Sequence, residues 1–269
     1  MGRIAQAFDR LDQEGRKGFI PFLTAGDPNL NTTLELMLEL ERAGATIIEL
    51  GIPFSDPMAD GPVIQRASER ALKNNFGINE VLDLVGKARE YTSVPIVLFT
   101  YFNPLLQYGL DQLVTTARKA GVDGVLVTDL PPEEGEEFAA DLLANDIDMI
   151  FLVAPTSTDE RLRLISQRAT GFIYAISRAG VTGPRSNVSD EAEKLVRRVR
   201  RFSTLPVAVG FGISNADQVA AVQRFADAVV VGSAIVAEIE RVFPKGDVVQ
   251  HVGMFARKLL AKGRNGYGE

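Results

Sequence analysis

The sequence of residues 96–127, IVLFTYFNPLLQYGLDQLVTTARKAGVDGVLV, contains one complete unit of the pattern that decides the fold. Residues 96–101 and 124–127 are short apolar runs rich in β-branched side chains, as in parallel strands that are covered on both faces. Between them, residues 110–120 have the apolar spacing of an amphipathic helix, and Gly121 follows its last turn. This unit predicts two parallel strands joined by a crossover helix.

The same alternation recurs along the 269-residue chain. The candidate strands are residues 19–23, 46–50, 96–101, 124–127, 149–153, 172–176, 207–209 and 228–231. Helix-period segments between them include residues 32–42, 110–120, 133–145, 190–202 and 215–225. Eight such units favour an α/β fold of the closed (β/α)8 TIM barrel type, with an open doubly wound sheet as the alternative on pattern alone.

Three segments exceed the repeating unit. The N-terminus predicts a short amphipathic helix with a shared apolar face formed by Ile4, Ala7, Phe8 and Leu11. An extended loop and helical insertion covers residues 51–91, and a C-terminal helix covers residues 248–262. Because no linker, low-complexity tract or charge block divides the chain, we expect residues 1–269 to form a single domain.

The composition limits the classes of partner. A net charge of −6 and a pI near 5.1 give no electrostatic reason to expect nucleic acid or an anionic membrane. The chain has no cysteine, which excludes disulfides, thiolate zinc sites and a cysteine nucleophile. No apolar run approaches the roughly 20 residues that span a bilayer, and the N-terminus lacks the apolar region of a signal peptide. We therefore expect a soluble, cytoplasmic protein.

The reactive side chains of such a barrel should lie in the loops at the carboxyl ends of its strands. The only histidine, His251, falls in the C-terminal helical extension, so we expect no histidine-based metal site. No lysine lies in a candidate strand or just after one, which disfavours a Schiff-base mechanism. Acid-base chemistry therefore falls to carboxylates or tyrosines.

Two carboxylates stand out in residues 47–62, IIELGIPFSDPMADGP. Glu49 lies in an apolar strand in phase with Ile47, so the two side chains should share the barrel interior. Desolvation there would raise the pKa of Glu49, which suits a group that gives and takes a proton near neutrality. The structural alternative is a glutamate at a strand end that pairs with an arginine or a loop amide.

Asp60 follows in a loop whose prolines restrict the backbone. The sequence Asp60-Gly61-Pro62 predicts a turn into the next helix. The alternative to a catalytic role is an aspartate that caps this helix. Asp56, in the same loop, should face solvent.

Glycine-rich turns follow the last three candidate strands, at residues 180–183, at residues 210–214 and at Gly232-Ser233, which opens the next helix. Glycines let backbone amides approach an anion, and a helix N-terminus adds a favourable dipole. Barrels frequently bind phosphate after strands seven and eight. We therefore expect a phosphate-binding barrel with a small phosphorylated substrate.

Residues 49–62 closely resemble the signature of tryptophan synthase alpha subunits. Further similar segments occur in family order, namely FIPFLTAGD (19–27), TYFNP (100–104), SRAGVTG (177–183), GFGIS (210–214) and VGSAIV (231–236). The resemblance implies a carbon–carbon lyase of tryptophan biosynthesis that cleaves indole-3-glycerol phosphate to indole and glyceraldehyde 3-phosphate. It also implies no cofactor in this chain, and a beta subunit that contains pyridoxal phosphate and joins it in an alpha2beta2 heterotetramer.

The resemblance also implies a role for each matching residue. Glu49 is the main acid-base group, Asp60 stabilises positive charge on the indole ring, and Tyr174 positions the glutamate. The residues that match the substrate pocket are Phe22, Phe99, Tyr101, Leu126, Thr128, Val153, Thr182 and Phe211; Phe99 and Thr128 stand where family members often have smaller or apolar residues. The residues that match the phosphate site are Gly183, Gly212, Gly232 and Ser233. The residues that match the partner interface and the closing loops are Pro53, Asp56 and Arg178, with Thr182 linking closure to Asp60.

Three other functions are weighed against this one. Another phosphate-barrel enzyme, such as a sugar-phosphate isomerase, would not account for Glu49 and Asp60 within their full motif. A non-catalytic subunit that only activates a beta partner would not need a carboxylate inside an apolar barrel mouth. A free-standing lyase that releases indole without a partner stays open on sequence alone.

Overall fold

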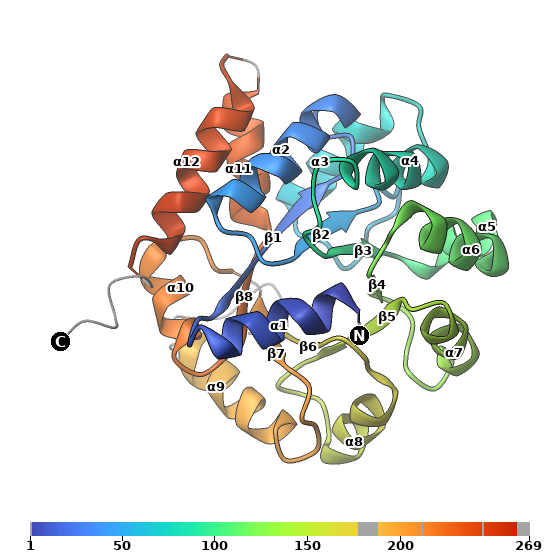
Figure 1. Cartoon of the computed structure of the whole chain (residues 1–269), viewed down its shortest axis with the longest axis vertical. Helices are drawn as coiled ribbons and strands as arrows, with labels where there is room; N and C mark the ends of the chain where they lie inside the picture. The colour runs from blue at the N-terminus through green and yellow to red at the C-terminus, as the bar shows by residue number, and fades with distance from the viewer. Residues whose placement is uncertain (1, 177–187, 211, 244, 263–269) are drawn as a thin grey trace.

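The computed structural model describes residues 2–176, 188–210, 212–243 and 245–262. Eight parallel strands form a closed barrel in chain order, and the last strand pairs with the first (Figure 1). They are β1 (Gly18–Thr24), β2 (Ile48–Gly51), β3 (Ile96–Thr100), β4 (Gly124–Val127), β5 (Asp148–Val153), β6 (Ile173–Ile176), β7 (Val207–Gly210) and β8 (Ala228–Val231). The predicted (β/α)8 barrel is confirmed, and the strand ends differ from the prediction by only one or two residues.

Helices surround the barrel on its outside (Figure 1). Those that follow the strands in the repeating pattern are α2 (Leu30–Ala43), α4 (Ile78–Ala88), α6 (Leu110–Ala120), α7 (Glu136–Ala144), α8 (Asp159–Arg168), α9 (Val188–Val199), α10 (Ala216–Gln223) and α11 (Ser233–Val242). Across the described ranges, no helix combines the length and the apolar character that a membrane span needs.

The three predicted additions to the barrel are present. They are the N-terminal helix α1 (Arg3–Gln13), the insertion after β2 with helix α3 (Pro62–Leu72), and the C-terminal helix α12 (Val248–Leu260). A further short helix, α5 (Phe102–Tyr108), follows β3 and was not predicted. Its seven residues are too few to show a helical period, and Pro104 lies in its first turn, where proline is tolerated.

The core has two layers, inside and outside the sheet. The outer layer packs strands against helices, whereas the inner layer fills the barrel with residues such as Ile20, Ile47 and Val97. Helix α1 closes the end at which the strands begin. There Ile4 joins the inner layer, and the Phe8 ring lies 5.9 Å from that of Phe172. Because α1 covers this end, the opposite end, where the strands finish, is left for a substrate.

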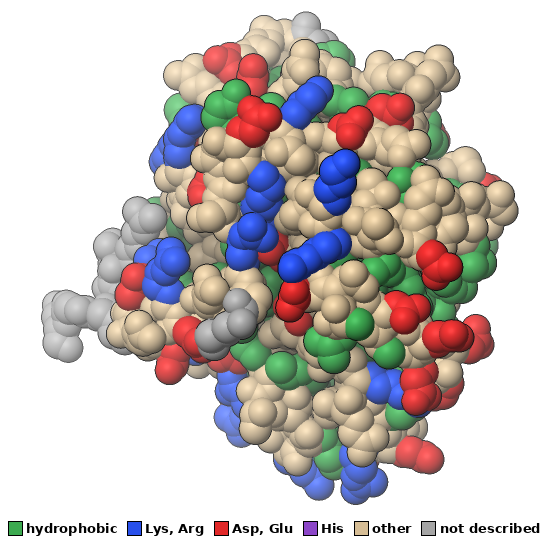
Figure 2. Space-filling view, turned by 45° about the vertical axis from the view of Figure 1, so that its right-hand side comes forward, with side chains coloured by type: hydrophobic (Ala, Val, Ile, Leu, Met, Phe, Trp, Pro, Cys, Tyr) green, Lys and Arg blue, Asp and Glu red, His purple; other side chains and the backbone are tan. Residues whose placement is uncertain are grey.

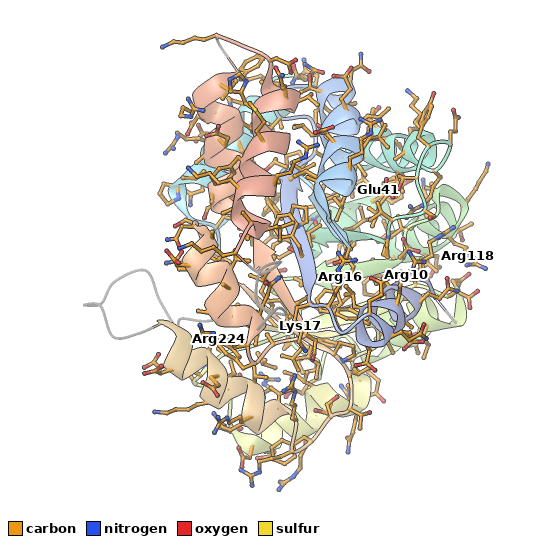
Figure 3. All side chains as sticks on the ribbon, turned by 60° about the vertical axis from the view of Figure 1, so that its left-hand side comes forward. Arg10, Arg16, Lys17, Glu41, Arg118 and Arg224 are labelled. Atoms are coloured by element: carbon orange, nitrogen blue, oxygen red, sulfur yellow. The ribbon has the colours of Figure 1, made fainter. Side chains whose placement is uncertain are left out.

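Figure 3 labels cationic side chains that precede strands, together with the acidic Glu41 of α2. Arg10, Arg16 and Lys17 lie on or just after α1 and precede β1, while Arg118 and Arg224 precede β4 and β8. On the face shown in Figure 2, acidic and basic side chains are both spread over the surface. Because the labelled cations lie where strands begin, they do not contribute to a site where the strands finish.

Candidate active site

Glu49 lies in β2, with Phe22 of β1 and Val97 of β3 as its partners in register. Its neighbours Ile48 and Leu50 belong to the outer core, so its own side chain points into the barrel, as predicted. The residue is only 1% exposed, and its buried Oε1 atom has no hydrogen-bond partner among the residues that the structure describes.

This burial raises the pKa of Glu49 from an ordinary 4.5 to about 8. Desolvation is the only cause of the shift, so no arginine among the described residues neutralises the carboxyl. The alternative of a structural ion pair at the strand end is therefore wrong for the described part of the chain. At neutral pH the side chain of Glu49 is mostly in its protonated form.

Tyr174 lies in β6 and is buried in the inner core. Burial, and then the charge of Glu49, raise the pKa of Tyr174 well above its ordinary value, so the two groups lie within electrostatic reach of each other. A Cβ atom at residue 210 would overlap the hydroxyl of Tyr174. Gly210, the last residue of β7, therefore leaves the space that this tyrosine occupies.

Asp60 lies at the end of the loop that joins β2 to α3, and its carboxylate accepts a hydrogen bond from the Tyr101 hydroxyl. The same hydroxyl accepts a hydrogen bond from the backbone N–H of Ala59 at 3.0 Å. Burial raises the pKa of Asp60 to about 6, although the bond from Tyr101 acts against the shift. Helix α3 begins after Gly61 and has no side-chain cap, so the alternative of Asp60 as a helix cap is wrong.

An aromatic pocket lies beside Asp60, between the ends of the first three strands and α3. Its lining residues are Phe22, Thr24, Gly51, Ile52, Asp60, Ile64, Ser68, Phe99, Thr100 and Tyr101. The rings of Phe22 and Phe99 are nearly perpendicular, with centroids 5.4 Å apart. The structure thus brings together three predicted pocket residues, Phe22, Phe99 and Tyr101.

One wall of this pocket was not predicted. It includes Ser68 of α3 and Thr24, whose buried Oγ1 atom has no hydrogen-bond partner within the described ranges. Their hydroxyl groups gave no recognisable signal in the sequence, because a single threonine or serine in these elements has many ordinary roles.

The predictions for β4 and β5 have different outcomes. Leu126 belongs to the inner core, and Thr128, two residues further on, donates a hydrogen bond from Oγ1 to the carbonyl of Thr100. Val153 instead packs in the outer core, between the sheet and the helices, so its assignment to the pocket is wrong. The adjacent residue, Leu152, packs against the inner core. Counting alternate positions from an inward-facing residue of β5 would have identified Leu152.

The start of α11 differs from that of the preceding helix. In α10 the side chain of Asn215 accepts a hydrogen bond from the N–H of Gln218 at 3.0 Å, whereas the N-cap of α11 is Gly232, which provides no side-chain cap. Uncapped amides at a helix N-terminus are suited to bind an anion. A Cβ atom at residue 232 would lie 3.5 Å from that of Phe22, so α11 begins beside the aromatic pocket.

The other predicted phosphate and loop residues are placed only in part. Gly212, in the turn after β7, has a φ of +75°, which favours glycine. Four other residues predicted for the phosphate site, the substrate pocket or the partner interface lie outside the described residues. They are Arg178, Thr182, Gly183 and Phe211.

The loop after β2 presents part of its length to solvent. Asp56 is exposed, as predicted, and Met58 is 93% exposed, which is unusual for a large apolar side chain. Pro53, in contrast, is buried at the base of the loop. Across the described residues, no group of three or more His, Cys, Asp or Glu side chains is placed to hold a metal ion.

This fold, with two carboxyl groups of different pKa where its strands finish, is that of a barrel enzyme that uses acid-base chemistry. A family model described as tryptophan synthase alpha chain matches residues 8–262. The chain therefore belongs to the tryptophan synthase alpha chain family, whose reaction is the cleavage of indole-3-glycerol phosphate in tryptophan biosynthesis.

Individual relatives agree with this assignment. The chain is 48% identical to the tryptophan synthase alpha chain of Geotalea uraniireducens over 97% of both chains, and 52% identical to that of Leptothrix cholodnii over 89% of both. The crystal structure of the alpha chain from Legionella pneumophila has a TM-score of 0.91 at 36% identity and covers 100% of both chains. A structure from the tryptophan synthase complex of Pyrococcus furiosus has a TM-score of 0.84 at 42% identity, with 91% of this chain and 98% of that chain covered.

The substitution Glu49→Gln should stabilise the fold in a pH-dependent manner. The folded-state pKa of about 8 lies above the ordinary 4.5, so wild type must bind a proton to fold, and it loses stability as the pH rises from about 4.5 to about 8. Relative to wild type, the variant should gain on the order of 3 kcal/mol between pH 4.5 and pH 7. Denaturant unfolding at several pH values measures this difference, with the exposed Glu90→Gln as the control. A difference that does not change with pH would contradict the assigned pKa.

Proposed function

We propose that this chain cleaves indole-3-glycerol phosphate with Glu49 as the group that moves protons and Asp60 as the group that stabilises the cationic ring. The chief support is the buried Glu49 carboxyl, which has a pKa of about 8 and no ionic partner among the described residues. The pKa of Asp60, about 6, lies below it. Near pH 7 one carboxyl is therefore mostly an acid and the other mostly an anion, which is how acid and base roles are divided between two carboxyls.

Protonated Glu49 and ionised Asp60 together can carry out the proton transfers of the cleavage. Protonated Glu49 donates its proton to C3 of the indole ring, and the resulting positive charge is shared with the ring nitrogen. Ionised Asp60 accepts a hydrogen bond from the ring N–H and stabilises this cation. Glu49, now ionised, removes the proton from the hydroxyl on the carbon bonded to C3.

Removal of this proton completes the reaction. The C–C bond breaks, its electron pair returns to the ring to give neutral indole, and the hydroxyl carbon becomes the aldehyde of glyceraldehyde 3-phosphate. Glu49 is again protonated at the end of the cycle. No cofactor in this chain enters the proposed sequence.

The rest of the site binds and orients the substrate in this proposal. Phe22, Phe99 and Tyr101 contact the indole ring, and Tyr101 also holds Asp60 through its hydroxyl. The amides at the start of α11, with those of the glycine-rich turns before it, bind the phosphate. Tyr174 restricts the position of the Glu49 carboxyl from across the barrel.

The partner of this chain is the tryptophan synthase beta subunit. The similar protein from Pyrococcus furiosus belongs to an a2b2 complex whose subunits activate each other. We infer the same assembly here, with pyridoxal phosphate in the beta subunit and with the loop of Asp56 and Met58 as part of the contact. The exposure of Met58 supports this contact, since a large apolar side chain in solvent is suited to be covered by a partner. A cytoplasmic location belongs to the same proposal and fits the cysteine-free composition.

The pH profile of kcat/KM for indole-3-glycerol phosphate should be bell-shaped. Activity should be lost below about pH 6, where Asp60 becomes protonated, and above about pH 8, where Glu49 loses its proton.

Glu49→Gln should abolish indole formation and keep substrate affinity within roughly tenfold, because the shape and the phosphate contacts persist. Unimpaired turnover by this variant, or a profile that stays flat from pH 5 to pH 9, would refute the assigned roles.

Titration with a cognate beta subunit should increase the rate of cleavage, because the contact loop leads directly to Asp60. The measurement follows indole-3-glycerol phosphate consumption while the beta subunit is added, and Met58→Asp should weaken the response by placing a charge in the apolar contact. If no complex forms and the rate is unchanged, the chain is a free-standing lyase.

A further inference from the structure

An ionic network of four side chains joins α3 to α11 and to the turn after β1. Arg70 of α3 donates two hydrogen bonds, from Nε and Nη2, to the two carboxylate oxygens of Asp27, both at 2.8 Å. The third guanidinium nitrogen of Arg70, Nη1, donates a hydrogen bond to Oε1 of Glu240 in α11 at 2.7 Å. Arg66, one turn earlier in α3, donates from Nε and Nη2 to the two oxygens of Glu240, again at 2.7 Å.

The network connects the elements that hold the two ends of the substrate site. Helix α3 begins at Pro62, two residues after Asp60, and so follows directly from the ring-binding end. Helix α11 begins at Ser233, at the phosphate-binding end. Asp27, which follows β1, is only 1% exposed and anchors the network to the barrel. Each helix therefore holds one end of the site, and Arg70 contacts both the barrel and the second helix.

A small apolar cluster packs between the same elements. Ala67 of α3, Val236 of α11 and Phe22 of β1 form this cluster, and both Ala67 and Val236 are fully buried. The methyl side chain of Ala67 keeps the two helices close, and the nearby Phe22 is itself a lining residue of the aromatic pocket. The relative position of α3 and α11 is thus set by apolar packing together with the ionic network.

The two carboxylates of the network differ in their energetics. The hydrogen bond from Arg66 and the charges of Arg70 and Arg66 lower the pKa of the partly exposed Glu240 to about 2, whereas the buried pair of Asp27 with Arg70 favours a geometric role over a stabilising one. Burial raises the pKa of Asp27 even though Arg70 faces it, so the pair does not fully recover the free energy of desolvation. What a two-pronged arginine–carboxylate contact does provide is a fixed orientation. By comparison, the pair of Arg241 with Glu238 lies within α11 and cannot fix one helix against another.

We infer that Arg70 and Glu240 are positioning residues that fix the separation between the ring-binding and the phosphate-binding ends of the site. This inference rests on the proposed function, because it assigns the two ends to Asp60 and to the start of α11. A substrate that spans both ends reacts well only when their spacing is correct, and a small displacement can lower the rate greatly. A fragment that occupies one end is insensitive to the spacing.

The variant Glu240→Gln tests this role, because it keeps the size of the side chain and removes the charge that both arginines contact. We expect kcat/KM for indole-3-glycerol phosphate to fall about tenfold. The inhibition constants of inorganic phosphate and of indole, each measured alone, should stay within about twofold of wild type, because neither end is itself altered. Glu238→Gln is the matched control on the same helix, and all of its constants should stay within about twofold of wild type.

Arg70→Lys is the second variant. The variant keeps the positive charge, but a lysine ammonium cannot reproduce the contacts of the guanidinium with the two oxygens of Asp27 and with Oε1 of Glu240. We therefore expect kcat/KM to fall at least as far as in Glu240→Gln. Near-ultraviolet circular dichroism and the thermal midpoint establish that each variant is folded; if Arg70→Lys does not fold, Glu240→Gln alone decides.

Two results would overturn the inference. One is a folded Glu240→Gln protein with kcat/KM within twofold of wild type. The other is a loss of affinity for phosphate or indole in the same proportion as the loss for the whole substrate, which would indicate damage to one end. Wild-type protein that does not cleave indole-3-glycerol phosphate would instead refute the proposed function, and the inference with it.

Discussion

The catalytic end of this barrel depends on the enclosure of the Glu49 carboxyl by apolar strands, with no ionic partner in the described part of the chain. Because water cannot solvate the anion there, the acid form persists at neutral pH, with a pKa of about 8. Asp60 is also partly desolvated, but the Tyr101 hydroxyl donates to it and limits the rise of its pKa to about 6. A difference in solvation and hydrogen bonding thus separates two carboxyls into an acid and an anion.

The surrounding structure maintains this difference. Helix α1 closes the end where the strands begin, so the interior beneath Glu49 is filled by side chains. Tyr174 and Phe22 occupy positions close to the carboxyl, and Gly210 leaves the space that Tyr174 needs. Burial of the Glu49 carboxyl lowers the stability of the fold at neutral pH, a cost that is common at active sites. The pair of Asp27 with Arg70 fits the same pattern, because burial raises the pKa of Asp27 although Arg70 faces it, so this pair fixes geometry with little net stabilisation.

The sequence was sufficient for the fold because apolar runs and helical spacing reflect local geometry and the burial of one face. Within the site, strand alternation placed Glu49 correctly, and the same rule applied to β5 would have chosen Leu152 over Val153. Features that depend on distant contacts could not be predicted. Whether Asp60 caps a helix or faces a pocket depends on its hydrogen bond with Tyr101, a residue far from it in the sequence. That no described residue pairs with Oε1 of Glu49 is likewise a property of the closed barrel.

The protonation state of Glu49 can be observed directly by infrared difference spectroscopy of wild type against Glu49→Gln as a function of pH. At pH 7 the difference spectrum should contain the carbonyl stretch of a protonated carboxylic acid, and this band should disappear with a midpoint of about pH 8. A carboxylate band at pH 7, with a midpoint near the ordinary 4.5, would show that the barrel does not hold Glu49 as an acid and would contradict the mechanism.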